Sequence, residues 1–156
     1  MTAYFFDSSA LAKRYLDEKG SAWVRQVFET PLAHTVYICE LTLVELASAV
    51  ARHVRAGALP KDYWRVFRPL LMSQLSQYEI VPFSRPFVEN TMALCFSSGL
   101  RAYDAIQLAT AILIRNNLPL RRGQPLSFVS ADSRLLAVAA RPEYDLCPIN
   151  PEIVSQ

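Results

Sequence analysis

Four acidic residues stand where one predicted element of the chain gives way to the next. Asp7 directly follows an apolar run in TAYFFDSSALAKRY, and Asp132 follows another in LSFVSADSRLLAVA. Glu45 lies within LTLVELASAV and Asp104 within LRAYDAIQLATA, each near the start of an apolar helical pattern. Carboxylates brought together without a counter-charge repel, and a hard divalent cation such as Mg²⁺ or Mn²⁺ relieves that repulsion. A cation held in this way polarises a phosphoryl oxygen and turns bound water into hydroxide.

Each acid also has a simpler interpretation as a residue that stabilises a helix end. Asp7 and Asp132 directly precede helical patterns, where an aspartate accepts hydrogen bonds from free amide groups. Thr42 and Glu45 have the spacing of a capping box, in which the glutamate reaches back to the threonine amide. Asp104 would favour its helix through the helix dipole. Capping is sufficient for any one acid alone, whereas the four together favour a shared site.

The elements that must position these acids are short strands alternating with helices. The predicted strands are residues 3–6, 34–38, 80–82, 126–130 and, with a weaker pattern, 145–149. Apolar residues at helical spacing form stripes around residues 41–54, 64–75, 87–95 and 106–113. This alternation predicts an α/β fold with a mostly parallel sheet. Asp7 and Asp132 would then stand at carboxyl ends of strands and face one rim together with Glu45, while the helix of Asp104 leans over it.

The overall composition limits the class of protein. The chain has 156 residues, 52% of them hydrophobic, which predicts one domain spanning 1–156 with a sizeable core. A net charge of +2 neither indicates nor forbids binding to nucleic acid. The three cysteines are far apart and form no CxxC pair, so we expect free thiols in a soluble, cytoplasmic protein. Uninterrupted apolar stretches fall short of the roughly 20 residues of a membrane span, so no membrane association is expected.

Other chemistries find few suitable residues. His34 falls in a predicted strand and His53 in the middle of a helix, so both are expected to be structural rather than catalytic. The four glycines form no GxxxxGK phosphate loop, and Ser8 and Ser9 lack the GxSxG setting of a nucleophile. A phosphatase of the haloacid dehalogenase type would need an aspartate at position 9, and the acidic pair of a receiver-like signalling domain is also missing.

The segments around the four acids resemble the acidic motifs of PIN-domain nucleases, in the same order and with similar spacing. The resemblance runs from Tyr4 to about Asn150 and is greatest for the small toxins of bacterial and archaeal VapBC toxin–antitoxin modules. The segment YDLCPINP near the end of the chain also looks like theirs. The resemblance implies a three-layer α/β/α sandwich around a mostly parallel sheet.

The same resemblance implies a Mg²⁺- or Mn²⁺-dependent ribonuclease that leaves a 5′-phosphate and a 3′-hydroxyl. Asp7, Glu45 and Asp104 match the three principal catalytic acids of the family, and Asp132 matches the fourth. Asp7 and Asp104 would ligate the metal, and Glu45 would ligate it or position the attacking water. Asp132 would ligate a second metal or hold water in the outer shell.

Further residues are assigned to substrate contacts. Ser8 and Ser130 are expected to cap helices and also to touch metal or phosphate. Arg121 and Arg122 precede a glycine in a polar loop, where they could clamp an RNA backbone. Ser130 stands where threonine is commoner in the family and Gln107 where histidine is frequent, and neither change removes an acid. Other basic residues that either follow the RNA backbone or are simply solvated are Lys13, Arg14, Arg52, Arg55 and Arg101.

The resemblance also implies partners. They are an RNA substrate, a small cognate antitoxin whose C-terminal segment lies in a groove near the acids, and a second copy of the toxin in a homodimer. Tyr63 and Trp64 are adjacent and cannot both face inward, so one of them is expected to serve a partner surface. Alternatives with the same fold are a free-standing PIN-domain nuclease in RNA processing and a catalytically silent PIN scaffold for protein interaction. The intact set of acids argues against the silent scaffold, and an adjacent antitoxin gene would distinguish the first two.

Overall fold

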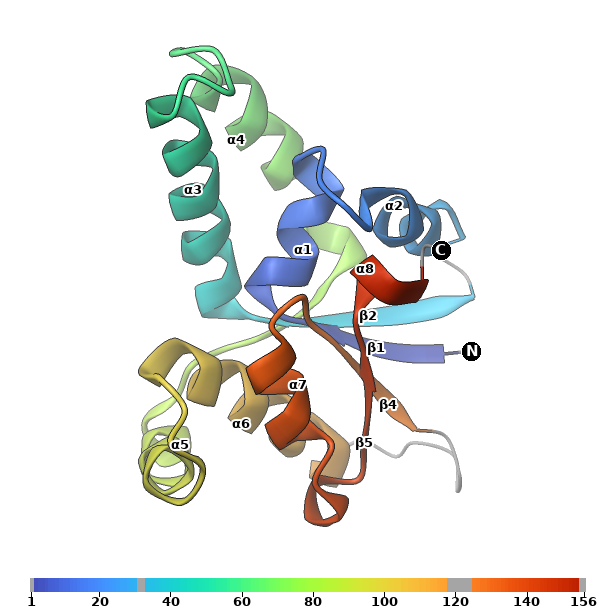
Figure 1. Cartoon of the computed structure of the whole chain (residues 1–156), viewed down its shortest axis with the longest axis vertical. Helices are drawn as coiled ribbons and strands as arrows, with labels where there is room; N and C mark the ends of the chain where they lie inside the picture. The colour runs from blue at the N-terminus through green and yellow to red at the C-terminus, as the bar shows by residue number, and fades with distance from the viewer. Residues whose placement is uncertain (1, 31–32, 118–124, 155–156) are drawn as a thin grey trace.

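A computed structural model describes residues 2–30, 33–117 and 125–154 of the chain (Figure 1). Five strands form one sheet in the order β3-β2-β1-β4-β5, and every neighbouring pair is parallel. The strands are β1 (Thr2–Phe6), β2 (His34–Cys39), β3 (Glu79–Val81), β4 (Leu126–Val129) and β5 (Leu146–Ile149). The predicted strands and the predicted parallel sheet are therefore confirmed, with strand ends displaced by a single residue.

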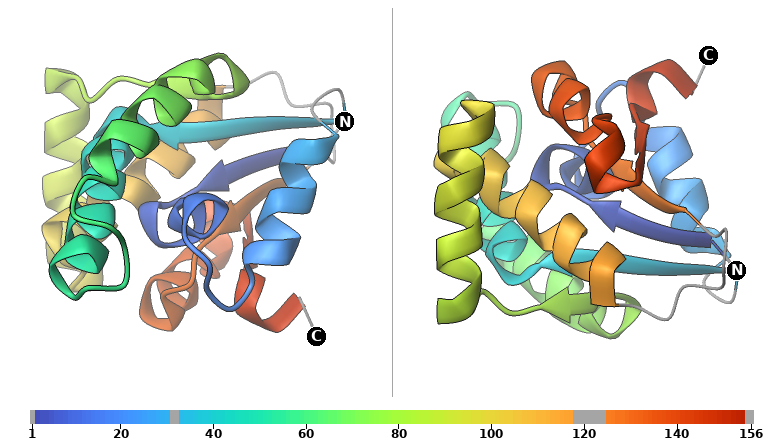
Figure 2. Two further views of the ribbon diagram at one scale, coloured as in Figure 1. Left: turned by 90° about the horizontal axis from the view of Figure 1, so that it is seen from above. Right: turned by 90° about the horizontal axis from the view of Figure 1, so that it is seen from below.

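Helices cover both faces of the sheet, which confirms the three-layer arrangement. Figure 2 shows one helical layer from above and the other from below. The first layer contains α1 (Ser8–Tyr15), α2 (Ser21–Glu29), α3 (Glu40–Arg55) and α4 (Trp64–Ser73). The second contains α5 (Arg85–Ser98), α6 (Ala102–Asn117) and α7 (Ser133–Ala139). Shorter pieces are the 3₁₀ turns η1 (Leu75–Gln77) and η2 (Pro142–Tyr144) and the last helix, α8 (Pro151–Val154), which packs on α2.

The central strand β1 is buried on both faces, because successive side chains of a strand point in opposite directions. Phe6 packs into the first layer with Leu11 and Phe67. Phe5 packs into the second layer, where its ring stacks on Phe128 at a centroid distance of 5.5 Å. Burial on both sides explains why the strand is a continuous apolar run rather than an alternating one.

Some residues of the predicted apolar stripes face solvent. Trp64 is 50% exposed while its neighbour Tyr63 is half-buried, so only one of the pair faces inward, as predicted. Val44, Leu70 and Met92 are also exposed, although each belongs to an apolar stripe. The three cysteines are free thiols, as expected. Among the described residues, no helix has the length and apolar character needed to span a membrane.

Candidate active site

The carboxyl ends of β1, β2 and β4 meet at one edge of the sheet. The chain pairs the central strand β1 with β2 on one side and, much later, with β4 on the other. In open parallel sheets such a reversal of strand order opens a crevice for ligands at this edge. Asp7 directly follows β1, and its amide donates to the carbonyl of Val129 at 3.0 Å. Asp7 therefore lies at the centre of the edge.

The carboxylate of Asp7 is buried, with only 3% of the residue exposed. Ser130 donates to its Oδ2 at 2.7 Å, and Ser9 donates to its Oδ1 at 2.8 Å. The amide of Ala10 also donates to Oδ1, at 2.8 Å, so the predicted N-cap of α1 is confirmed. Burial raises the pKa of Asp7 from 3.8 to about 6; the hydrogen bonds oppose the rise, and the charge of Glu45 adds to it.

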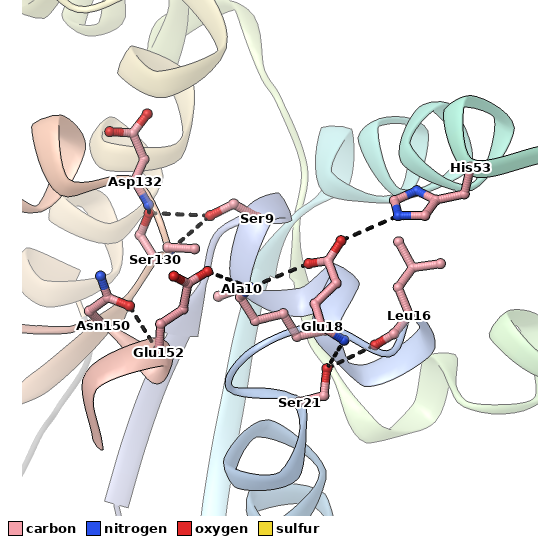
Figure 3. A network of polar contacts seen from close by, with 12 residues as sticks. Ser9, Ala10, Leu16, Glu18, Ser21, His53, Ser130, Asp132, Asn150 and Glu152 are labelled. Carbon is pink, nitrogen blue, oxygen red and sulfur yellow. Dashed lines mark hydrogen bonds and ion pairs between the residues drawn. The ribbon is translucent and has the colours of Figure 1, made fainter. Parts of the chain in front are cut away.

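Ser130 connects Asp7 to Asp132. It is fully buried, and its Oγ accepts a hydrogen bond from the Asp132 amide at 3.0 Å. The amide of Ala131 donates to Oγ of Ser9 at 2.9 Å, which ties the turn after β4 to the start of α1 (Figure 3). Oδ1 of Asp132 accepts two backbone amide hydrogen bonds at the start of α7, so its predicted capping role is confirmed.

Glu45 is half-buried in α3 and accepts a hydrogen bond from Gln107 of α6, from Nε2 to Oε2, at 2.5 Å. The predicted capping box with Thr42 is wrong, because α3 begins before Thr42 and both residues lie inside the helix. Burial raises the pKa of Glu45, hydrogen bonds from Gln107 and Ser8 lower it, and the charge of Asp104 raises it. Glu45 thus faces the other acids rather than its own helix end.

Asp104 lies in the first turn of α6, where the helix dipole favours a negative charge. Burial raises the pKa of Asp104, the charge of Asp132 raises it further, and Arg101 and Arg134 oppose the rise. The place of Arg134 was not indicated by the sequence, because an exposed arginine on a helix gives no signal of its position relative to an acid 30 residues earlier.

The acids fit a hard divalent cation by donor chemistry. Within the described residues, no group of three or more His, Cys, Asp or Glu side chains is placed so that it could hold a metal ion. Mg²⁺, however, commonly takes one or two protein carboxylates and fills the rest of its shell with water. The carboxylates here influence one another in successive pairs, which are Asp7 with Glu45, Glu45 with Asp104, and Asp104 with Asp132.

Residues 4–141 match the family model of the PIN domain. The chain belongs to the PIN-domain family. FitAcB from Neisseria gonorrhoeae has the same fold, with a TM-score of 0.62 and 19% identity over 95% of this chain and 97% of that one. A toxin–antitoxin complex from Klebsiella pneumoniae gives a TM-score of 0.59 and 24% identity over 95% of this chain and 97% of that one.

A third PIN-fold neighbour is VapBC2 from Rickettsia felis, solved bound to a DNA fragment from its promoter. It has a TM-score of 0.61 and 15% identity over 96% of this chain and 98% of that one. No curated protein matches the chain. At these identities the solved structures establish the shared fold, and the predicted membership of the PIN-domain family is confirmed.

A groove of about 560 Å³ leads away from the acids of the PIN domain between α1 and α3. Ser8 and Glu45 line it near the acids, and Arg52 and His53 line it further along α3. Tyr103 also lines the groove and is 59% exposed. The place of His53 on this groove was not indicated by the sequence, because the opposite wall comes from a helix far away along the chain.

The far end of the groove carries an ion-pair network (Figure 3). Lys13 is 2% exposed and lies 2.8 Å from Glu152 of α8 and 3.3 Å from Glu18. Nε2 of His53 lies 3.4 Å from the other oxygen of Glu18. Lys13 therefore ties α1 to the end of the chain, which favours a structural role over contact with an RNA backbone.

The other basic residues divide by position. Arg14 packs over an aromatic ring, 3.9 Å from its centroid, and so serves packing between helices. Arg52 lines the groove, and the charge of Arg101 lowers the pKa of Asp104. Both positions are compatible with contacts to phosphate groups. Arg121 and Arg122 lie outside the described residues.

Proposed function

We propose that this PIN domain is a metal-dependent endoribonuclease that hydrolyses RNA phosphodiester bonds. The observation that carries the proposal is the mutual influence of Asp7, Glu45 and Asp104, each of which has a pKa raised by burial and by the charge of another acid. Buried carboxylates that repel one another in a crevice are typical of sites that bind a cation or perform chemistry. The resemblance to PIN-domain nucleases supports the same conclusion.

The acids have distinct roles in this proposal. Asp7 and Asp104 would hold Mg²⁺ or Mn²⁺, and Glu45 would either ligate the ion or position the attacking water. Asp132 would ligate a second ion or hold a water in the outer shell. When bound, the cation would polarise a phosphoryl oxygen and lower the pKa of a bound water. Asp132 has the lesser role in metal binding, because its Oδ1 already caps α7.

Hydroxyl groups orient the acids for this role. Ser130 and Ser9 donate to opposite oxygens of Asp7, so the carboxylate is fixed at both ends. With a pKa of about 6, Asp7 is mostly ionised at pH 7 and needs no base to release its proton before it binds a cation. Ser8 is a hydrogen-bond partner of Glu45. Ser8 and Ser130 thus support the carboxylates, and their contact with metal or phosphate stays a proposal.

The groove supplies a path for single-stranded RNA. Tyr103 exposes its ring on the groove wall next to Asp104, and an aromatic ring in such a place stacks an unpaired base. Arg52 on the α3 side of the groove and Arg101 near Asp104 supply positive charge for phosphate groups. A duplex fits this arrangement poorly, because its bases are already stacked on one another.

We further propose that the protein is the toxin of a type II toxin–antitoxin module with a small cognate antitoxin. The neighbours from Klebsiella pneumoniae and Rickettsia felis support this proposal. The α3–α4 side also suits a partner, because Trp64, Val66 and Leu70 are exposed there. A pocket of about 280 Å³ beside Trp64 is edged by Arg55 and Lys61, so an apolar segment with acidic residues would match it.

A homodimer is proposed from a different surface. Phe96 on α5 is 92% exposed and Met92, one turn before it, is 57% exposed. Exposed apolar residues of this size on one helix are typical of protein–protein contacts. A free-standing nuclease in RNA processing is the alternative function, and the exposed α3–α4 side favours the toxin because it fits a dedicated partner.

Cleavage of single-stranded RNA by the purified protein tests the proposed activity. We expect cleavage with Mg²⁺ or Mn²⁺, loss of cleavage in EDTA, and products that carry a 5′-phosphate. Asp7→Asn purified in the same way controls for contaminating ribonucleases. Undiminished cleavage in EDTA, or equal cleavage by a folded Asp7→Asn variant, contradicts the proposal. Growth arrest on expression separates a toxin from a processing enzyme, since only the toxin should stop growth and be relieved by a co-expressed antitoxin.

A further inference from the structure

A buried amide reaches the acidic edge from the second helical layer. Gln107 of α6 is only 2% exposed, and its Nε2 donates to Oε2 of Glu45 at 2.5 Å. The same amide contacts the hydroxyl of Thr42, which is fully buried one turn before Glu45 in α3. Thr42 Oγ1 lies 3.0 Å from Nε2 and 3.2 Å from Oε1 of Gln107. The contact therefore joins α3 and α6 directly behind an acid of the site.

The carboxylate of Glu45 determines which end of the amide faces it. A carboxylate accepts hydrogen bonds only, so the NH₂ group of Gln107 must point toward it. The hydroxyl of Thr42 can donate to Oε1 or accept from Nε2, so it gives the buried amide a second polar partner. A charge-assisted hydrogen bond is stronger than one between neutral groups, so Glu45 is held more firmly than packing alone would hold it.

A glutamine at position 107 is explained better by its hydrogen bonds than by packing. Neighbouring buried residues of α6 are Ala105, Leu108 and Ala109, and a leucine at 107 would fill a similar volume. Burying an amide costs free energy unless hydrogen bonds compensate for the lost water. The hydrogen bond from Gln107 to Glu45 offsets that cost, and Glu45 is a carboxylate that the proposed reaction uses.

We propose that Gln107 is the positioning residue of Glu45. Its amide holds Oε2, so that Oε1 would be the oxygen of Glu45 that ligates the cation. This inference rests on the proposed metal-dependent function. Because a carboxamide does not titrate, Gln107 offers the same donor at every pH at which the protein is folded.

Mn²⁺ titration, followed by the electron paramagnetic resonance signal of the free ion, tests the inference. Gln107→Leu should weaken Mn²⁺ binding by about 10- to 100-fold, the usual effect of losing an outer-shell partner. It should lower kcat and leave KM for RNA unchanged, because RNA contacts lie on the groove and not behind Glu45. Gln107→His, whose ring N–H can donate, should recover most of the affinity. Thr110→Val is the matched control, because it removes a buried hydroxyl of the same helix that bonds to Ile106.

A folded Gln107→Leu protein with wild-type Mn²⁺ affinity and kcat overturns the inference. If Gln107→Leu does not fold, Thr42→Val decides, since it removes the hydroxyl that holds the amide against α3. It should weaken Mn²⁺ binding in the same direction by a smaller factor, and unchanged binding overturns the inference.

A readout without metal separates this inference from the proposed function. The side-chain NH₂ signals of Gln107 in the NMR spectrum of the metal-free protein should shift in Glu45→Gln and stay unchanged in Glu29→Gln, a variant at an exposed site of α2. Unmoved signals in Glu45→Gln overturn the positioning contact. If the signals shift in Glu45→Gln but the wild-type protein neither binds Mn²⁺ nor cleaves RNA, the proposed function is contradicted. The Gln107–Glu45 contact is then established, and only the ligation part of the inference is overturned.

Discussion

Ser130 donates a hydrogen bond to Oδ2 of Asp7 at 2.7 Å, although 123 residues separate them along the chain. The contact joins the ends of β1 and β4 and holds a buried carboxylate at the centre of the sheet edge. Burial raises the pKa of Asp7 and this hydrogen bond lowers it. Ser130 therefore acts on the charge of Asp7, and the two residues should be tested together.

The metal-free protein is predicted to lose stability as the pH rises through the range in which Asp7 ionises. Folded Asp7 keeps its proton up to a pH of about 6, whereas the unfolded chain releases it near pH 3.8. The folded state binds more protons in this window, so the free energy of unfolding falls by up to about 3 kcal/mol as the pH rises. Urea denaturation in EDTA between about pH 4 and pH 7 measures this fall.

Two variants check that the fall belongs to Asp7. Asp7→Asn cannot titrate, so its stability should depend less on pH in this window. Ser130→Ala removes a group that lowers the pKa of Asp7, so the fall should extend to higher pH. Parallel curves for the wild type and Asp7→Asn would show that Asp7 does not titrate in this way.

Asp104→Asn distinguishes a metal ligand from a residue that merely favours its helix. The change keeps the shape of the side chain and removes its charge. We expect cleavage to fall by more than about 100-fold, because even outer-shell partners of a metal cost up to that factor. The melting temperature in EDTA should hold or rise, since repulsion from Asp132 falls. Asp17→Asn, on an exposed carboxylate, is the control, and wild-type activity in folded Asp104→Asn would refute the assigned role.

The strands of this PIN domain, and the places of Asp7 and Asp132 at strand ends, were predictable for local reasons. The apolar runs before Asp7 and Asp132 mark strand ends by their composition alone. Parallel strands then bring those ends to one edge without any knowledge of tertiary contacts. The places of Asp7 and Asp132 could be predicted because they follow from element order rather than from side-chain orientation.

Contacts between distant helices were not predictable in the same way. Gln107 and Glu45 are 62 residues apart, and nothing local indicates that α6 places the amide against α3. Lys13 is an ordinary surface residue by type, and its burial depends on Glu152 near the end of the chain. Val44 belongs to an apolar stripe but is 66% exposed, because it lines the open groove instead of the core. Such features depend on packing angles, which periodicity does not specify.

Tyr103→Ala is predicted to weaken binding of single-stranded RNA. Stacking of one base on an aromatic ring contributes about 1–3 kcal/mol, which corresponds to a loss of affinity of about 5- to 150-fold. Tyr103→Phe keeps the ring and should bind normally. Fluorescence anisotropy with a labelled oligonucleotide in EDTA measures binding without cleavage.

Trp64→Ala is the matched control for this experiment, because Trp64 is an exposed aromatic residue on α4 that does not line the groove. Equal affinity for RNA in the wild type and Tyr103→Ala would argue against base stacking. If Tyr103→Ala instead weakened only the binding of a protein partner, the ring would belong to that interface.

Lys13→Met is predicted to destabilise the fold without a direct effect on RNA binding. The change leaves Glu18 and Glu152 without the cation between them. Both glutamates are 35% exposed, so water screens part of the repulsion, and the expected loss is about 1–3 kcal/mol instead of the 3–5 kcal/mol of a fully buried pair. Urea denaturation measures the loss, with Lys19→Met as the exposed control. A stable Lys13→Met protein that no longer binds RNA would show that Lys13 contacts the substrate.

The most direct test of the proposed site is the position of Mn²⁺ in a crystal of this protein, located by anomalous diffraction. The proposed function predicts an anomalous peak at the carboxyl edge of the sheet, ligated by Asp7 and by at least one of Glu45 and Asp104. The peak should disappear in crystals of Asp7→Asn. A crystal soaked at a Mn²⁺ concentration that supports cleavage, yet without a peak at this edge or with Mn²⁺ bound only elsewhere, would contradict the assignment of these acids as the metal site.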